Sequence, residues 1–213
     1  MKKALFIFSL FLLTSVSTPA FAQMGDSRIG LKGGLNLSTL YTGDIEDRNP
    51  RVGYHIGIFT ELAVSEYFSV QPELLFSTKG NVNTYDIDGP ANIINAEGEA
   101  EISFAYLELP ILAKIAILEV INIHAGPYIG YMVDANTSLE GDVAGNFEED
   151  IDRDHFNNWD VGVAVGAGVD LSAVTIGARY SWGLVEVAES EAAKLLLGSG
   201  KNAVLQGYIA IGF

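Results

Sequence analysis

Apolar residues recur at every second position over much of the chain, which is the pattern of a β-strand with two different faces. In the segment 173–184, Val174, Ile176 and Trp182 share one face, whereas Arg179 lies on the other. The same pattern predicts eight strands, at residues 28–39, 51–64, 67–80, 101–116, 120–134, 158–171, 173–184 and 203–213. Several exceed the usual length of about five or six residues and suit a tilted strand that crosses a bilayer.

The connections between these segments alternate between short and long. Ser65-Glu66, Leu118-Glu119 and Ser172-Ala173 are predicted to be tight turns. The other connections are long, polar and acidic: residues 40–50, 81–100, 135–157 and 185–202. The pattern predicts an all-β fold, an eight-stranded antiparallel up-and-down transmembrane β-barrel with short periplasmic turns, long extracellular loops and periplasmic termini.

The polar face of the predicted strands is rich in glycine, with single charged residues between the glycines. Gly30, Lys32 and Gly34 share this face in the first strand, and Asp160 and Gly162 share it in the sixth. Glycine weakens a strand and has no obvious use on a water-exposed surface. The interior of an eight-stranded barrel, however, is just wide enough for side chains to fill. This face is therefore expected to line a narrow lumen.

The predicted lumen collects ionisable side chains: Lys32, His55, Glu61, Glu73, Lys79, Glu108, Lys114, His124, Asp160, Asp170 and Arg179. Opposite charges in a confined interior should pair, because an unpaired buried charge is costly. Arg179 is expected within ion-pair reach of at least one carboxylate, with Glu73, Glu108, Asp160 and Asp170 as candidates. Histidine beside a carboxylate could also serve general acid–base chemistry, but a structural network without catalytic residues or cofactor is the favoured interpretation.

Three predicted strands contain a proline, at Pro72, Pro110 and Pro127. Each proline removes one hydrogen bond from the strand ladder because it lacks a backbone N–H. We expect a bulge or local kink at each position, with Pro110 on the inner face.

Aromatic residues of the apolar face gather near strand ends. They are Tyr54, Tyr131, Trp159, Tyr180 and Trp182 at the outer ends, and Phe68 and Phe213 at the periplasmic ends. Aromatic rings with a polar edge prefer the membrane–water interface, so two aromatic girdles are predicted.

The last strand also resembles the C-terminal signal that the outer-membrane barrel assembly machinery reads. Its residues are Gly207, Tyr208, Ile209, Ile211 and the terminal Phe213.

The start of the chain has the features of a secretory signal peptide. Lys2 and Lys3 precede an apolar core, and Ala20-Phe21-Ala22 forms a cleavage site, so residues 1–22 are predicted to be removed and 23–213 to form the barrel domain. The first 22 residues hold two of the 12 basic residues and none of the 27 acidic ones, which leaves a net charge of −17. Such an acidic balance argues against nucleic acid as a partner.

Several stretches resemble the family of outer-membrane protein beta-barrel domains, which includes PorT-like proteins. They are "GLKGGLNLS", "VQPELLFSTKG", "YLELPILAK", "GPYIGY", "GAGVDL" and "IGARYSWGL". The resemblance spans nearly the whole mature chain and implies an eight-stranded barrel in the outer membrane of a Gram-negative bacterium. One founding member is linked to protein secretion, so a secretion-associated envelope role is one implied function.

The leading hypothesis is a non-enzymatic barrel with a filled polar lumen. It would contact outer-membrane lipid, the assembly machinery during biogenesis, and an envelope or extracellular protein partner through its loops or turns. Alternatives are a rim enzyme using Asp154 and His155, a soluble lipocalin-like carrier with an apolar lumen, and a channel, which a filled interior disfavours. A Ca²⁺ site is a further candidate, in the acidic loop Glu148, Glu149, Asp150, Asp152 and Asp154; the other interpretation of this loop is a solvated acidic stretch.

Overall fold

A computed structural model describes residues 27–41, 49–88, 95–118, 120–141, 147–150, 156–188 and 200–213. The predicted signal peptide lies outside the described residues, as do Asp152, Asp154 and His155 and the side chains of Glu148, Glu149 and Asp150. Within the described part, no helix is long and apolar enough to cross a membrane.

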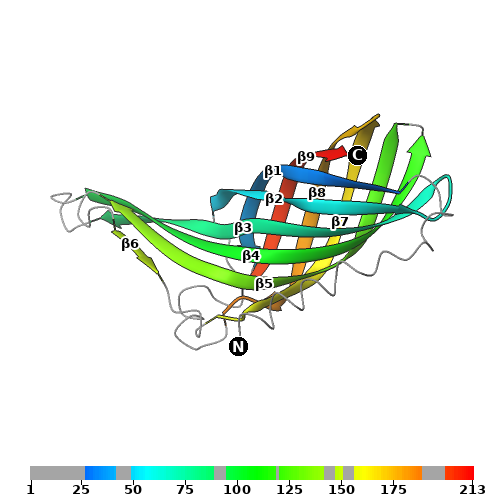
Figure 1. The fold of residues 1–213 in the computed structure, drawn as a ribbon. Helices are drawn as coiled ribbons and strands as arrows, with labels where there is room; N and C mark the ends of the chain where they lie inside the picture. Colours follow the sequence, from blue (N-terminus) through cyan, green and yellow to red (C-terminus); the bar gives the residue numbers. More distant parts are fainter. Residues whose placement is uncertain are drawn as a thin grey trace, which may run out of the picture.

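The described residues form a sheet of antiparallel strands, eight of which close into a barrel (Figure 1). The strands are β1 (Arg28–Tyr41), β2 (Asn49–Ala63), β3 (Phe68–Asp88), β4 (Asn95–Leu118), β5 (Ile121–Gly141), β6 (Phe147–Asp150), β7 (Trp159–Leu171), β8 (Val174–Glu186) and β9 (Lys201–Gly212). The ring closes because β9 pairs with β1 and β5 pairs with both β4 and β7. The predicted eight-stranded all-β barrel is confirmed, and β6 is an additional short strand beside β5.

The ring closes with an offset along the strands. From Tyr131 of β5, the paired residues run through Leu107, Phe76, Ile56, Gly33, Ile209, Ile176 and Val169 to Ile121. The path returns to β5 ten residues away from its start, at 121 in place of 131. An offset of this kind requires the strands to tilt against the barrel axis.

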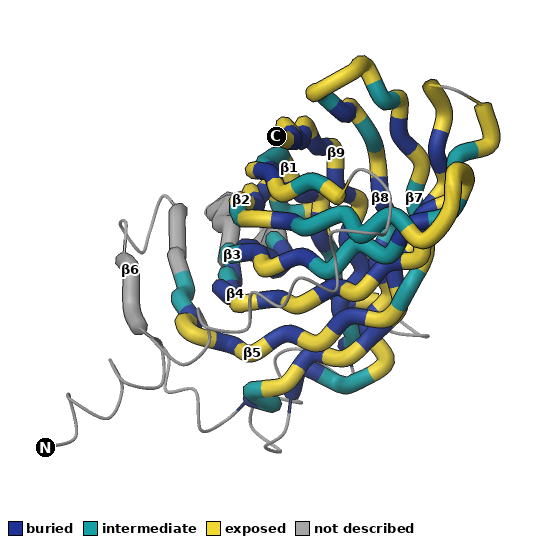
Figure 2. Tube along the Cα trace, turned by 45° about the vertical axis from the view of Figure 1, so that its right-hand side comes forward, coloured by how far each residue is buried: buried dark blue, intermediate teal, exposed yellow. Residues whose placement is uncertain are grey.

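Side chains alternate between an apolar outer face and a polar inner face, as the alternating colours in Figure 2 show. Leu35 and Ile209 on the outer face are 64% and 53% exposed, whereas Lys32 and Arg179 on the inner face are each 2% exposed. A barrel in water would show the opposite arrangement. The exposed belt of Leu, Ile and Val therefore suits a surface that faces hydrocarbon.

The tight turns at Ser65-Glu66 and Ser172-Ala173 lie where they were predicted, and with the short interval between β4 and β5 they define one end of the barrel, the turn end. Glu119, in the third predicted turn, lies outside the described residues. At the opposite end, the prediction of long loops was partly wrong. β3 and β4 stay paired as far as Asp88 and Asn95, and β5 continues to Gly141. Residues 81–88, 95–100, 135–141 and 147–150 are therefore strand, because hairpin pairing continues past the point where the apolar alternation ends.

A bulge or a local kink was expected at each of the three prolines, and the pairing shows no bulge at any of them. The pairing register continues unchanged through Pro72, Pro110 and Pro127, since a proline removes one donor without adding a residue to the strand. Pro110 does lie on the buried inner face. One register shift instead falls in β5 opposite Ala105 and Tyr106, between Met132 and Asp134. Beyond this bulge the inner and outer faces of β5 exchange, so that Asp134 is exposed.

An apolar cluster, the cap, fills the barrel at the end opposite the turns. Its members are Leu40, Ile102, Phe104, Tyr106, Met132, Ala135, Phe156, Val187 and Ala188. Phe156 and Ala188 form a β-bridge, and the Phe156 ring meets Phe104 edge-on at 5.3 Å between centroids. The lumen thus ends in packed hydrocarbon at the cap end and in polar side chains at the turn end.

Candidate functional site: the barrel lumen

The centre of the lumen holds a buried ion triad, the central cluster, formed by Arg179 of β8, Glu73 of β3 and Lys32 of β1. Arg179 donates two hydrogen bonds to the carboxylate, from Nη1 at 2.8 Å and from Nη2 at 2.7 Å. Lys32 Nζ donates to the same carboxylate at 3.0 Å. Fork-shaped pairing of this kind is both strong and directional. One carboxylate therefore ties three strands together across the barrel.

Aromatic and amide side chains surround the central cluster. The ring of Tyr208 lies 3.8 Å from Lys32 Nζ, a distance at which a ring face stabilises a cation. Gln71 donates to Glu73 at 2.7 Å, and Arg179 Nε donates to His124 Nε2 at 3.4 Å. His55 Nδ1 lies 2.7 Å from Asn36 Oδ1. His124 therefore contacts a guanidinium through Nε2, and His55 contacts a side-chain amide through Nδ1.

Glycine makes room for these side chains. A Cβ added at Gly177 would lie 2.5 Å from the hydroxyl of Tyr208, and one at Gly162 would lie 2.6 Å from the ring of Tyr128. Any larger residue at either position would collide with an aromatic ring inside the barrel. The glycine-rich inner face is therefore a steric requirement of the filled lumen.

A second charged group, the cap-side cluster, lies between the central cluster and the cap. Lys79 of β3 pairs with Glu108 at 2.5 Å and with Asp160 of β7 at 2.7 Å. The rings of Tyr106 and Tyr128 lie 5.1 Å and 4.8 Å from its Nζ. Two carboxylates and two aromatic rings surround one ammonium group, so that Lys79 links β3 to β4 and, across the lumen, to β7.

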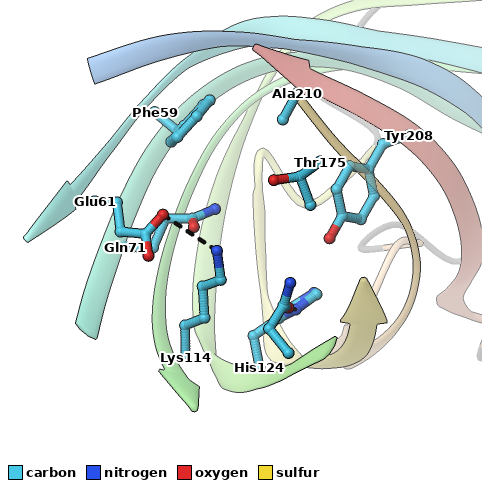
Figure 3. Close-up of a pocket in the computed structure, with 9 residues that line it drawn as sticks. Phe59, Glu61, Gln71, Lys114, His124, Thr175, Tyr208 and Ala210 are labelled. Carbon is cyan, nitrogen blue, oxygen red and sulfur yellow. Dashed lines mark hydrogen bonds and ion pairs between the residues drawn. The ribbon is translucent and has the colours of Figure 1, made fainter. Parts of the chain in front are cut away.

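A third group, the mouth cluster, closes the turn end (Figure 3). Lys114 lies 3.2 Å from both Glu61 and Asp170, and Arg28 lies 2.9 Å from Glu61. Figure 3 shows Glu61 and Lys114 pointing toward each other from neighbouring parts of the wall, with Tyr208 across a small hollow. Two cations and two anions balance here, in a partly exposed setting.

The eleven ionisable residues expected to line the lumen all lie on the inner face. The central cluster contains Lys32, Glu73 and Arg179; the cap-side cluster contains Lys79, Glu108 and Asp160; the mouth cluster contains Glu61, Lys114 and Asp170; and His55 and His124 lie beside the central cluster. Arg179 forms its ion pair with Glu73, which was one of four candidate partners; Glu108, Asp160 and Asp170 pair with other cations.

The sequence analysis missed the neutral half of the lumen. Tyr106, Tyr128, Asn122, Asn202 and Gln206 are all buried on the inner face, and Tyr208 was considered only for assembly. Asn202, for example, donates to Asp160 at 3.1 Å. The strand alternation alone could have identified these residues, because each lies on the face of its strand opposite the apolar residues.

The aromatic residues expected at the interfaces face outward. Trp159 packs on Tyr131 with 5.0 Å between ring centroids, and Trp182 packs on Tyr180 at 4.4 Å. Tyr54 and Phe213 are 52% and 76% exposed. Gly207, Ile209 and Ile211 share the outer face with Phe213, whereas Tyr208 points into the lumen.

This arrangement restricts the chemistry that the lumen can support. Cations, carboxylates and amides pair with one another, and no group of three metal-ligating side chains that could hold an ion occurs among the described residues. Buried charge on all sides is the opposite of the apolar cavity of a lipocalin-type carrier. Ion clusters and the cap occupy the interior along its length, which suits a structural plug better than an aqueous pore.

Comparison with known proteins gave one family match and a set of solved barrels. The model of the outer membrane protein beta-barrel domain matches residues 21–189. Ail of Yersinia pestis, crystallised with the heparin analogue sucrose octasulfate, aligns at 10% identity over 88% of this chain and 99% of its own, with a TM-score of 0.47. Neisserial surface protein A aligns at 8% identity over 88% and 97% of the two chains, with a TM-score of 0.44. OprG of Pseudomonas aeruginosa aligns at 11% identity over 87% and 93%, with a TM-score of 0.38. No curated protein matched.

Proposed function

The chain belongs to the family of outer membrane protein beta-barrel domains, and from this we propose that it is a non-enzymatic interaction protein of the bacterial outer membrane. Its binding surface would be the part of the sheet that extends past the barrel ring. The barrel would act as a rigid membrane anchor for that surface.

The observation that carries the proposal is the unequal length of the strands. Among the described residues, β2 is paired only as far as Val82 and β7 begins opposite Tyr131, whereas β3, β4 and β5 continue beyond these points and β6 adds to them. We call this extension the projecting sheet, comprising residues 83–88, 95–100, 134–141 and 147–150. Figure 1 shows it reaching past the ends of the other strands.

The filled lumen supports the same proposal because it disfavours transport through the barrel. Three ion clusters and the apolar cap occupy the interior, so transport through the barrel is disfavoured. We expect purified barrel in a planar lipid bilayer to give no stable conductance. Regular open-channel current steps would contradict a filled lumen and support a channel function instead.

The proposed orientation places the projecting sheet outside the cell and the tight turns in the periplasm, as in other outer-membrane barrels. Cysteine is absent from the chain, so a single introduced thiol reports on its own position. Asp134→Cys at the projecting sheet should react with a membrane-impermeant maleimide on intact cells. Glu66→Cys, in the exposed turn between β2 and β3, should react only after the outer membrane is opened. The reverse result would refute the orientation, and with it the proposed binding surface.

A further inference from the structure

A small hollow lies inside the barrel between the mouth cluster and the central cluster (Figure 3). Its wall includes the apolar side chains of Phe59 and Ala210 and the polar side chains of Gln71, Lys114 and Tyr208. The space has room for about one water molecule. The hollow is therefore too small for an organic ligand but large enough for a single small molecule or ion.

Most polar side chains around the hollow already make hydrogen bonds to other residues. Thr175 donates to Asp170 at 2.5 Å, and Asn122 donates to the same carboxylate at 2.8 Å. The side-chain oxygen of Asn122 lies 3.1 Å from Nδ1 of His124, whose Nε2 accepts from Arg179. These side chains are held by protein partners and need no ligand.

Three polar groups of the wall keep hydrogen-bonding capacity that no described residue uses. The hydroxyl of Tyr208 has no hydrogen-bond partner among the described residues, although the residue is only 6% exposed, and Figure 3 shows it directed into the hollow. Gln71 donates to Glu73 through Nε2, while its Oε1 has no partner in the described part of the chain. Lys114 Nζ donates to two carboxylates of the mouth cluster, which leaves its third N–H. A buried polar group without a partner is costly, so a ligand that pairs with these groups would stabilise the barrel.

The chemistry of the three groups selects the ligand. The ammonium of Lys114 can only donate a hydrogen bond, Oε1 of Gln71 can only accept one, and the hydroxyl of Tyr208 can do either. A metal cation cannot accept a hydrogen bond from the ammonium, and a halide ion cannot donate one to the amide oxygen. A water molecule does both, and buried water molecules make about three hydrogen bonds each.

We propose that the hollow binds one ordered water molecule, which hydrogen-bonds to Tyr208, Gln71 and Lys114. This water would join two networks that are otherwise separate, since Lys114 belongs to the mouth cluster and Gln71 donates to Glu73 of the central cluster. Side-chain exposure falls from 26% at Arg28 through 7% at Lys114 to 0% at Glu73, so the water would enter from the turn end. The inference is independent of the proposed binding surface, which lies at the opposite end of the barrel.

The direct test is a crystal structure of the purified barrel, at a resolution that shows single water molecules, from crystals soaked in rubidium bromide. Electron density is expected within hydrogen-bonding distance of Tyr208 Oη, Gln71 Oε1 and Lys114 Nζ, without anomalous scattering from either ion. A bromide signal at this position would assign an anion site, and a rubidium signal would assign a cation site. Either signal, or a hollow without density, would overturn the water site.

A pair of variants of nearly equal shape tests the same site in the lipid-embedded protein. Ala210→Thr and Ala210→Val crowd the hollow equally, but only the threonine hydroxyl can replace hydrogen bonds of the displaced water. In urea unfolding of the barrel in phospholipid vesicles, the midpoint of the threonine variant should exceed that of the valine variant by roughly 0.3–1 M. A valine variant at least as stable as the threonine variant would show that the hollow is dry and would refute the proposal.

Gly207 provides the matched control for this pair. An added carbon there meets nothing within 4 Å, and the residue lies on the outer face of the same strand. Because this face contacts hydrocarbon, Gly207→Val should be at least as stable as Gly207→Thr. Migration on a denaturing gel before and after boiling verifies that each variant still forms a barrel.

Tyr208→Phe gives a second test that does not depend on the Ala210 variants folding. It keeps the ring over Lys32 and removes only the hydroxyl. If the hydroxyl binds water, its loss should lower the urea midpoint, because the water loses a partner. If the hydroxyl is unpaired, its removal should raise the midpoint, and that result would overturn the water site.

Discussion

Substitution of Glu73 is expected to be the most damaging single change in the barrel. The carboxylate accepts two hydrogen bonds from Arg179 and two from Lys32, and all three side chains are almost completely buried. Glu73→Gln keeps the size of the side chain but leaves two cations without their anion. Removing one partner of a buried ion pair costs about 3–5 kcal/mol, and we expect a loss of unfolding free energy in this range.

The same reasoning predicts a rescue. Replacing the whole triad, Glu73→Gln with Lys32→Met and Arg179→Met, removes every uncompensated charge at similar volume. Substitution of a buried ionic group by apolar residues is often neutral or stabilising by about 1–4 kcal/mol, so the triple variant should recover most of the loss. Arg179→Met alone should cost less than Glu73→Gln, because Lys32 still balances Glu73.

Equilibrium unfolding in urea, with the barrel in phospholipid vesicles, measures these differences. Fluorescence of the chain's two tryptophans, Trp159 and Trp182, reports unfolding because both lie on the outer face. The parent and Glu66→Gln, a surface acid without a partner role in the lumen clusters, serve as references. A Glu73→Gln variant within about 1 kcal/mol of the parent, or a triple variant no more stable than the single one, would refute the charge-balance reasoning.

Other predictions test the lumen, the lipid face and assembly. Gly177→Val should lose about 1–3 kcal/mol in the same urea assay because its side chain would collide with Tyr208, whereas Gly207→Ala should be nearly neutral because an added Cβ meets nothing within 4 Å there; equal losses would contradict the filled lumen. Leu205→Lys, on the exposed outer face near the middle of β9, should cost about 2–4 kcal/mol in vesicles, and an unchanged stability would argue against a lipid-facing belt. Deletion of Phe213 should lower the amount of heat-modifiable barrel in cells, while refolding in vitro stays close to that of the parent. Normal assembly of this variant in cells would contradict a C-terminal assembly signal.

The barrel and its inner face were largely predictable from the sequence because a strand exposes alternate residues to opposite sides. Once one face of β8 is apolar, Arg179 must lie on the other. The same rule, applied strand by strand, placed eleven charged or ionisable residues of the lumen on the inner face, although Arg28 of the mouth cluster was not among them. The rule acts within a single strand, so no knowledge of neighbouring strands was needed.

The partners of those charges were not predictable in the same way. Arg179 and Glu73 are 106 positions apart, and any register shift by two residues would keep the same faces while changing every neighbour. The length of β3, β4 and β5 was also underestimated, because polar residues beyond the bilayer no longer alternate with apolar ones. The prolines were expected to distort strands, but the pairing continues through them.

The sequence by itself determined the class of the protein, the two faces of its strands and most of the charged residues of its interior, because these depend on local alternation and on which side chains tolerate hydrocarbon. Only the tertiary structure decided which carboxylate each cation meets, how the cap closes one end and how far β3, β4 and β5 extend past the start of β7. Those features depend on the offset with which the ring closes and on the unequal lengths of its strands. Both are properties of the whole sheet and of no single segment.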